Sequence, residues 1–82
     1  MIHAHIFEYM RDAVYCAQCF VNEHQENVEK AVHNPMPIIR LKNGDEHHFM
    51  NNEYAKRWCL GRDYMFDGRL YHSGFCVQDD GR

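Results

Sequence analysis

The residues best suited to chemistry gather between Arg57 and Gly74, in the stretch RWCLGRDYMFDGRLYHSG. Arginine guanidinium groups match phosphate oxygens in a bidentate manner, and flat aromatic rings stack on bases or on guanidinium groups. The stretch therefore predicts a site for a phosphate-bearing, planar ligand, formed by Arg57, Trp58, Arg62, Tyr64, Arg69, Tyr71, His72 and Ser73. The alternative is that Trp58 belongs to the core and that the arginines pair with nearby carboxylates, namely those of Glu53, Asp63 and Asp67.

A two-residue hairpin is predicted to position this set. Asp67-Gly68 is typical of a type I′ turn, in which both central residues have positive φ. With that turn, Phe66 pairs with Arg69, Met65 with Leu70, and Tyr64 with Tyr71. Side chains alternate between the faces of a strand, so we expect Met65 and Leu70 to face the core. The arginine and tyrosine side chains would then face a ligand.

Two further groups of residues suggest other chemistry. Cys16 and Cys19 stand three residues apart, a spacing that puts both thiols on one face of a helix, and with His5 or His24 they could bind zinc. No second cysteine pair has matching spacing, so a metal site is only an alternative. Asp63 and His72 would be neighbours across the hairpin, where a carboxylate can fix an imidazole tautomer. A structural hydrogen bond is the simpler reading, because only Ser73 offers a nearby nucleophile.

Seven histidines are present, including His3 with His5 and His47 with His48. Adjacent residues of a strand point to opposite faces. We therefore expect His47 and His48 not to share a metal ion, and we expect no cofactor.

The remaining elements are predicted from periodicity and turn residues. Apolar residues recur at helical spacing from Ile6 to His24, which predicts a long N-terminal helix. Residues 25–32 are ambiguous between helix and strand. Ile38–Lys42 and Asp45–Met50 form a predicted hairpin with a three-residue loop at Asn43–Asp45, which opposes Lys42 to Glu46. A short helix follows, capped by Asn51 or Asn52 and stopped at Gly61.

This order predicts an α+β fold: a small antiparallel sheet of hairpins packed against one long N-terminal helix and one short helix, with both helices on one face. Eighty-two residues form a single domain, 1–82, with a thin core that a homo-oligomer would enlarge. Met1–His5 is expected to be a lead-in, either a helical turn or a small edge strand.

Composition excludes several classes. An apolar content of 45% and an aromatic content of 13% indicate a globular chain. The net charge of −3 gives no general attraction to nucleic acid. No apolar run is long enough for a membrane span, and we expect no signal peptide. A cytoplasmic location follows by default, with the four cysteines as reduced thiols.

The segments LKNGDEHHFM and RWCLGRDYMFDGRLYHSG resemble short accessory proteins encoded by tailed phages and prophages. Those proteins have an NG-x-x-I-H-F hairpin, a short helix, and an ending of the form W-x-x-G-R-x-Y … G-x-x-Y-x-S-G. The resemblance covers the C-terminal half, and His47 departs from it where an aliphatic residue is expected. It implies a viral protein, acting in the host cytoplasm, that counters host defence by binding an immune protein or by sequestering a nucleotide signal.

Three functions follow from these observations. The first is a non-enzymatic binding protein for a nucleotide-type small molecule or a host defence protein. The second is a nucleic-acid-associated regulator that uses the cations of Lys56, Arg57, Arg62 and Arg69. The third is a small metalloprotein or hydrolase that uses Cys16 and Cys19, or Asp63 and His72.

Overall fold

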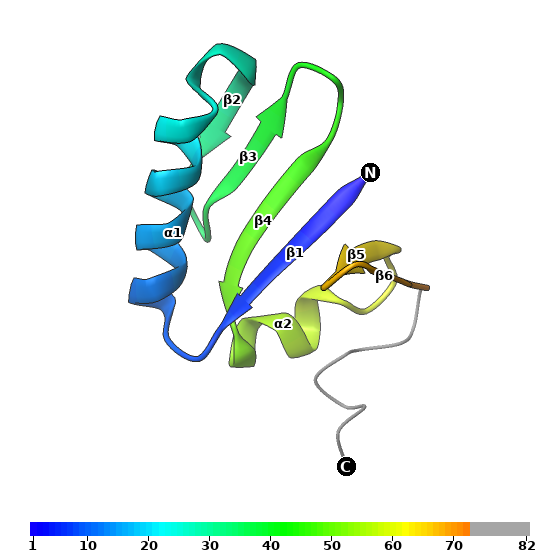
Figure 1. The fold of residues 1–82 in the computed structure, drawn as a ribbon. Helices are drawn as coiled ribbons and strands as arrows, with labels where there is room; N and C mark the ends of the chain where they lie inside the picture. Colours follow the sequence, from blue (N-terminus) through cyan, green and yellow to red (C-terminus); the bar gives the residue numbers. More distant parts are fainter. Residues whose placement is uncertain (73–82) are drawn as a thin grey trace.

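The computed structural model describes residues 1–72 (Figure 1). The elements are β1 (Ile2–Phe7), α1 (Met10–Glu23), the 3₁₀ turn η1 (Gln25–Asn27), β2 (Val28–Val32), β3 (Ile38–Leu41), β4 (Glu46–Asn51), α2 (Asn52–Trp58), β5 (Tyr64–Phe66) and β6 (Arg69–Tyr71). The six strands form one sheet in the order β2-β3-β4-β1-β5-β6. The α+β class is therefore confirmed.

The sheet is mixed rather than antiparallel. The β2–β3, β3–β4 and β5–β6 pairs are antiparallel, but β1 runs parallel to both of its neighbours, β4 and β5. The expectation that Met1–His5 is a lead-in or an edge strand is wrong, because β1 lies in the middle of the sheet (Figure 1). In its segment IHAHIF, His3 and His5 alternate with Ile2, Ala4 and Ile6; Ala4 is buried and the other residues are half-buried.

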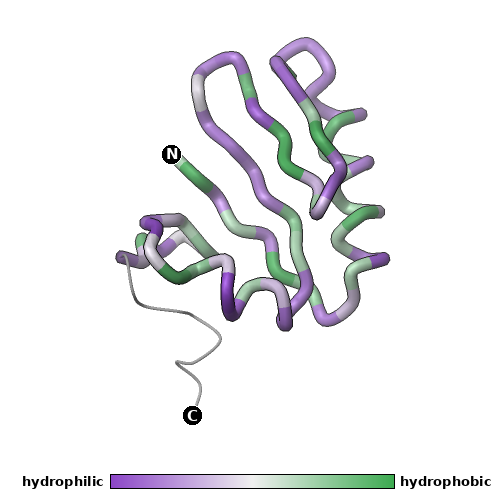
Figure 2. Tube along the Cα trace, turned by 180° about the vertical axis from the view of Figure 1, so that it is seen from behind, coloured by the Kyte–Doolittle hydropathy of each residue, from purple (hydrophilic) through white to green (hydrophobic). Residues whose placement is uncertain are grey.

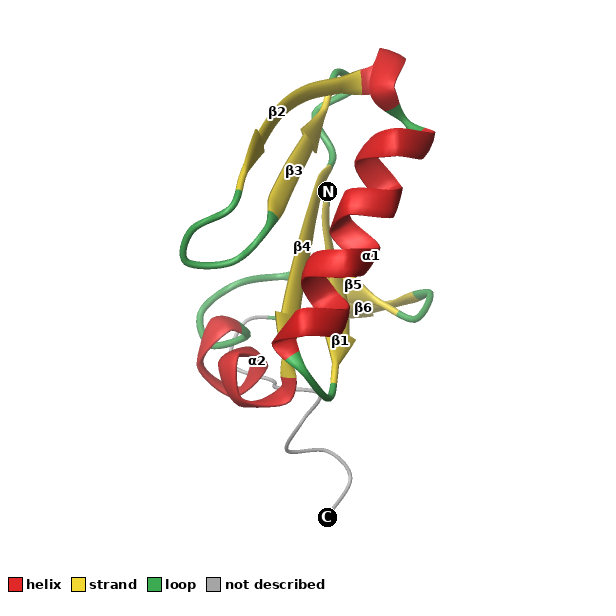
Figure 3. Cartoon of the chain, turned by 90° about the vertical axis from the view of Figure 1, so that its left-hand side faces the viewer, coloured by secondary structure: helices red, strands yellow, loops and turns green. Residues whose placement is uncertain are grey.

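The helices cover opposite faces of the sheet, as the edge-on view shows (Figure 3). Helix α1 packs through Ala13 and Ala17 against Ile39 and Phe49. On the other face, α2 packs through Ala55 and Trp58 in a second cluster with Met50 and other buried residues. The expectation of helices on a single face is therefore wrong. The sequence of β4 agrees with two covered faces, because His48, Phe49 and Met50 are buried consecutively.

Hydrophobic and hydrophilic residues are mixed along the strands, and β4 changes from hydrophilic at Glu46–His48 to hydrophobic at Phe49 and Met50 (Figure 2). In β4, Glu46, His48 and Met50 lie on the α2 face, whereas His47 and Phe49 lie on the α1 face. The prediction that His47 and His48 point to opposite faces is thus confirmed.

The β3–β4 hairpin has a three-residue loop, as predicted, but shifted by one position. Arg40 pairs with Glu46 and Ile39 with His47, and Leu41 N–H donates to the Asp45 carbonyl at 2.8 Å. The loop is therefore residues 42–44, and the predicted pairing of Lys42 with Glu46 is wrong. Gly44 has φ +98°, a left-handed value that glycine adopts without steric cost.

Candidate functional site: a pocket between α2 and the β3–β4 hairpin

The β5–β6 hairpin forms with the predicted register and turn. Tyr64 pairs with Tyr71, Met65 with Leu70, and Phe66 with Arg69. Asp67 and Gly68 have φ values of +52° and +79°, as a type I′ turn requires. The pairing ends at Tyr64 and Tyr71, so Asp63 and His72 lie beyond the paired residues. Ser73 lies outside the described residues.

The hairpin presents the opposite face to the one expected. Tyr64 is fully buried beneath Trp58, with ring centroids 4.9 Å apart in an edge-on arrangement. Phe66 and Tyr71 pack against the same cluster, whereas Leu70 is 48% exposed. Strand alternation was assigned correctly, but the core lies on the tyrosine side because α2 brings Trp58 there. Tyr64 is therefore a core residue and cannot stack on a ligand in this arrangement.

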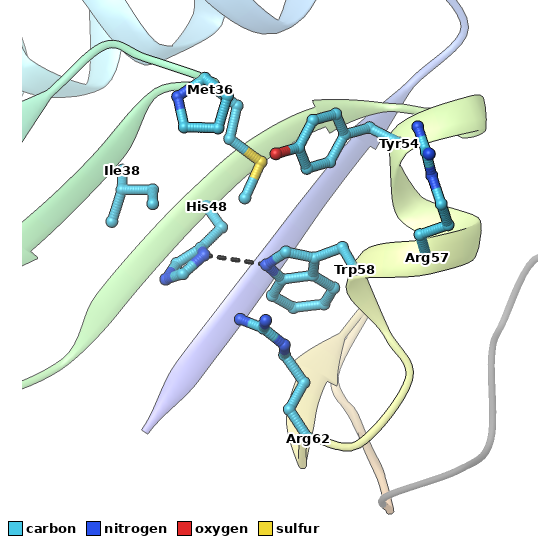
Figure 4. Close-up of a pocket in the computed structure, with 8 residues that line it drawn as sticks. Met36, Ile38, His48, Tyr54, Arg57, Trp58 and Arg62 are labelled. Atoms are coloured by element: carbon cyan, nitrogen blue, oxygen red, sulfur yellow. Dashed lines mark hydrogen bonds between the residues drawn. The ribbon is translucent and has the colours of Figure 1, made fainter.

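Three of the predicted ligand residues line one pocket: Arg57 and Trp58 from α2, and Arg62 from the turn that follows (Figure 4). The pocket has a volume of about 470 Å³. Its other lining residues come from the β2–β3 connection, from β3 and β4 and from the start of α2; they are Pro35, Met36, Ile38, His48 and Tyr54. Arg69, Tyr71 and His72 do not line it.

Helix α2 begins where the sequence predicts. The Asn51 side chain accepts a hydrogen bond from Tyr54 N–H at 2.8 Å, which confirms the N-cap. Gly61 has φ +78° just past the helix end, as expected of a helix-stopping glycine. These two signals fix a short helix whose inner side carries Trp58 and whose outer side carries Arg57.

A chain of hydrogen bonds lies at the base of the pocket. Trp58 Nε1 donates to His48 Nδ1 at 3.0 Å, and the second ring nitrogen of His48 lies 3.0 Å from Glu46 Oε1. An indole N–H is only a donor, so His48 Nδ1 must be the acceptor and His48 Nε2 must hold the proton. The other oxygen of Glu46 accepts from Arg40, with the shortest distance 2.7 Å.

Electrostatics keep this chain in one protonation state. Burial lowers the pKa of His48, and the positive charge of Arg62 lowers it further, against the opposing hydrogen bond to Glu46. Hydrogen bonds from His48 and then from Arg40 lower the pKa of Glu46. A neutral His48 and an ionised Glu46 thus use both imidazole nitrogens and both carboxylate oxygens. The arrangement fixes Trp58 in place.

Arg62 is the unusual residue of the pocket. Its guanidinium carbon lies 4.8 Å from the centre of the Trp58 ring, and in Figure 4 the side chain extends along the indole toward His48. Its Nε atom is buried and has no hydrogen-bond partner among residues 1–72. Within residues 1–72, neither Arg57 nor Arg62 forms an ion pair. No carboxylate within residues 1–72 neutralises Arg57 or Arg62, so the predicted alternative of ion-paired arginines does not hold for these two residues.

The alternative of a metal site finds no support in residues 1–72. No group of three or more His, Cys, Asp or Glu side chains in this range is arranged to hold a metal ion. Cys16 and Cys19 are free thiols, half-buried on α1. Cys59, in contrast, is disulfide-bonded. The prediction of four reduced thiols is therefore wrong for Cys59.

Sequence reasoning missed the pocket residues that precede α2. His48 was treated as one of a histidine pair, and Met36 and Ile38 only as parts of a loop and a strand. Side chains alternate between the two faces of β4, which places His48 on the same face as Met50. This alternation is the one sequence signal that could have indicated His48 as a pocket residue.

Comparisons of the chain with protein-family models, with curated proteins and with solved structures find no match. None of the helices in the described part of the chain has the length and apolar character that crossing a membrane requires. The class that fold and pocket define is thus a small α+β protein with a cationic, aromatic pocket on one face of a mixed sheet.

Proposed function

We propose that this protein is a non-enzymatic binding module for a nucleotide-type anion, held in the pocket between α2 and the β3–β4 hairpin. Sequestration of such a ligand to counter host defence, which the resemblance to phage accessory proteins implies, belongs to the same proposal. The observation that supports it best is Arg62, whose buried Nε has no partner and whose guanidinium has no ion pair among residues 1–72.

A buried polar group without a hydrogen bond costs free energy. The Trp58 ring holds the guanidinium by a cation–π contact, so Arg62 is positioned before any ligand arrives. A phosphate oxygen could accept from it, and exposed Arg57 supplies a second cation at the same pocket. The indole is not available for stacking, because Trp58 is only 4% exposed.

The opposite wall suits a planar or apolar part of a ligand. Half-buried Ile38 and the half-buried ring of Tyr54 give this wall its surface, and Met36, only 3% exposed, lies between them (Figure 4). The volume of about 470 Å³ falls within the usual range for small-molecule sites. The ligand thus needs a negative group for the arginines and a flat group for the wall, which together describe a nucleotide.

Calorimetry with tag-free protein tests the proposal against mononucleotides, cyclic oligonucleotides and ADP-ribose derivatives. We expect at least one to bind, and Arg62→Ala to weaken that binding by roughly tenfold or more, since a charge-assisted hydrogen bond contributes 1.5–3 kcal/mol or so. Arg62→Lys keeps the charge but loses the planar fork, so it should restore binding only partly.

Arg11→Ala is the matched control. Arg11 also lies over an aromatic ring, with its guanidinium carbon 4.9 Å from the centre of Tyr9, but it belongs to α1 and does not line the pocket. This variant should bind like the original protein. Absence of heat with every ligand, or equal binding by Arg62→Ala, would overturn the proposal.

A further inference from the structure

The sheet face that bears the pocket holds a second cavity of about 220 Å³. Its lining comes from three strands: Lys30 and Val32 from β2, Ile38 and Arg40 from β3, and Glu46 from β4. Val32 pairs with Ile38 and Lys30 with Arg40, so these four side chains share one face. Ile38 lines both cavities, which makes them neighbours on that face.

The two cavities differ in how their cations are used. Arg40 is already paired with Glu46 at 2.7 Å, and the remaining oxygen of Glu46 is engaged by His48. Lys30 is exposed and forms no ion pair with any residue from 1 to 72. The surface therefore has unpaired cations at its two ends, Lys30 in one cavity and Arg57 with Arg62 in the other, with apolar Ile38 between them.

The strands separate the two ends of this surface: Lys30 is on β2, and His48, which lines the first cavity with Arg62, is on β4, two strands away or about 9–10 Å. The Ile38–His48 pair and the Arg40–Glu46 pair are two residues apart along the hairpin, which is about 7 Å. Lys30 pairs with Arg40, so it lies level with the Arg40–Glu46 pair and one strand further out, on β2, whereas Arg62 lines the first cavity together with His48. A ligand that contacts both ends needs two separate negative groups joined by a part that can cross Ile38.

We infer that the two cavities form one continuous site for a dinucleotide or longer single-stranded oligonucleotide, with one phosphate at Arg62 and the next toward Lys30. This inference rests on the proposed function, because it extends the same pocket. A sugar and base crossing Ile38 would lie on apolar surface, and the contact with each phosphate is electrostatic and independent of base sequence.

The test compares 5′-phosphorylated dinucleotides with the matching mononucleotides, for all four bases, by calorimetry on the full chain. We expect each dinucleotide to bind at least tenfold more tightly than its mononucleotide. Lys30→Ala should abolish that gain and leave mononucleotide affinity within about twofold, whereas Arg62→Ala should weaken both. Raising the salt concentration should reduce dinucleotide affinity more steeply than mononucleotide affinity, because more phosphate charges are neutralised.

Lys42→Ala is the control for removal of a positive charge. Lys42 is an exposed lysine in the loop between β3 and β4, and it lines neither cavity. It should leave both affinities unchanged. Equal affinity for mononucleotides and dinucleotides, or no effect of Lys30→Ala, would overturn this inference while Arg62-dependent mononucleotide binding would still support the proposed function. Failure of every nucleotide to bind would overturn both.

Discussion

His5 Nε2 and His47 Nδ1 lie 2.9 Å apart and join the central strand β1 to β4 on the face covered by α1. One nitrogen must donate and the other accept, so the pair needs at least one neutral ring. The ring of His47 also stacks on His3 and contacts Phe20, each with a centroid distance of 4.5 Å, and His5 stacks on Phe49. These histidines therefore pack as half-buried aromatic rings at the edge of the core on the α1 side.

The first prediction is that mild acid destabilises the fold. Burial, followed by the nearby charges of His3 and His48, lowers the pKa of His5 to about 4. Burial, followed by His3 and His5, lowers the pKa of His47 to about 4, with Asp45 acting in the opposite direction and His24 adding to the decrease. An unfolded histidine has a pKa near 6.5. The unfolded chain thus binds more protons in this range, and stability should fall as the pH decreases from about 6.5 to 4.

Urea unfolding followed by fluorescence at several pH values measures this loss. We expect a decrease on the order of 1–3 kcal/mol, below the full value of the two shifts because both rings are only partly buried. His47→Phe removes one titrating ring from the pair and should flatten the dependence. A pH-independent free energy of unfolding between 6.5 and 4 would contradict the prediction.

The second prediction concerns the hydrogen bond between Trp58 and His48. Trp58→Phe removes the indole donor and leaves a buried acceptor on His48, which should cost about 1–3 kcal/mol. The freed Nδ1 can then take a proton, so the pKa of His48 should rise. Denaturant unfolding measures the first effect and an NMR titration of the His48 ring the second. An unchanged His48 pKa would show that the indole does not control its protonation.

The third prediction tests the turn that shapes the second hairpin. Gly68 has φ +79°, and a methyl group added there would meet no atom within 4 Å. Gly68→Ala should therefore destabilise only through backbone strain, by about 1–2 kcal/mol. Asp67→Asn, which keeps a residue that tolerates its φ of +52°, should be nearly neutral. Equal thermal midpoints for the two variants would argue against the I′ turn.

The fourth prediction concerns the contact between α1 and the sheet. Ala13 is completely buried against Ile39 and Phe49. Ala13→Leu forces three more carbon atoms into this contact and should cost about 1–3 kcal/mol or more. Gln18→Leu, an exposed position on the same helix, is the control and should change stability by less than about 0.5 kcal/mol. A stable Ala13→Leu protein would mean that α1 can shift away from the sheet at little cost.

Local chemistry accounts for what could be predicted from sequence. Asn51 caps α2 through its own side chain, Gly61 follows the helix end with positive φ, and Asp67-Gly68 makes the turn that its residue types favour. These features depend on residues within a few positions of one another. For the same reason the register of the β5–β6 hairpin was correct, and Arg57, Trp58 and Arg62 were recognised as neighbours.

Long-range contacts decided the rest. A parallel pairing between β1 and β4 joins residues 44 positions apart, as in Ile2 with Glu46, and no local signal in IHAHIF indicates it. That pairing puts β1 at the centre of the sheet, where α1 covers one face and α2 the other. The burial of Tyr64 follows, because alternation assigns side chains to two faces but only the docking of α2 determines which face is the core.

The sequence by itself determined the cap and stop of α2, the turn and register of the β5–β6 hairpin and the cluster of cations near α2, because each depends on the conformational preferences of adjacent residues. Only the tertiary structure decided that Arg62 lies on Trp58, that His48 closes the base of the pocket, and that Tyr64 faces inward. Those relationships depend on the packing of strands and helices that are distant along the chain. Tertiary packing of this kind overrides the local preferences of any one segment.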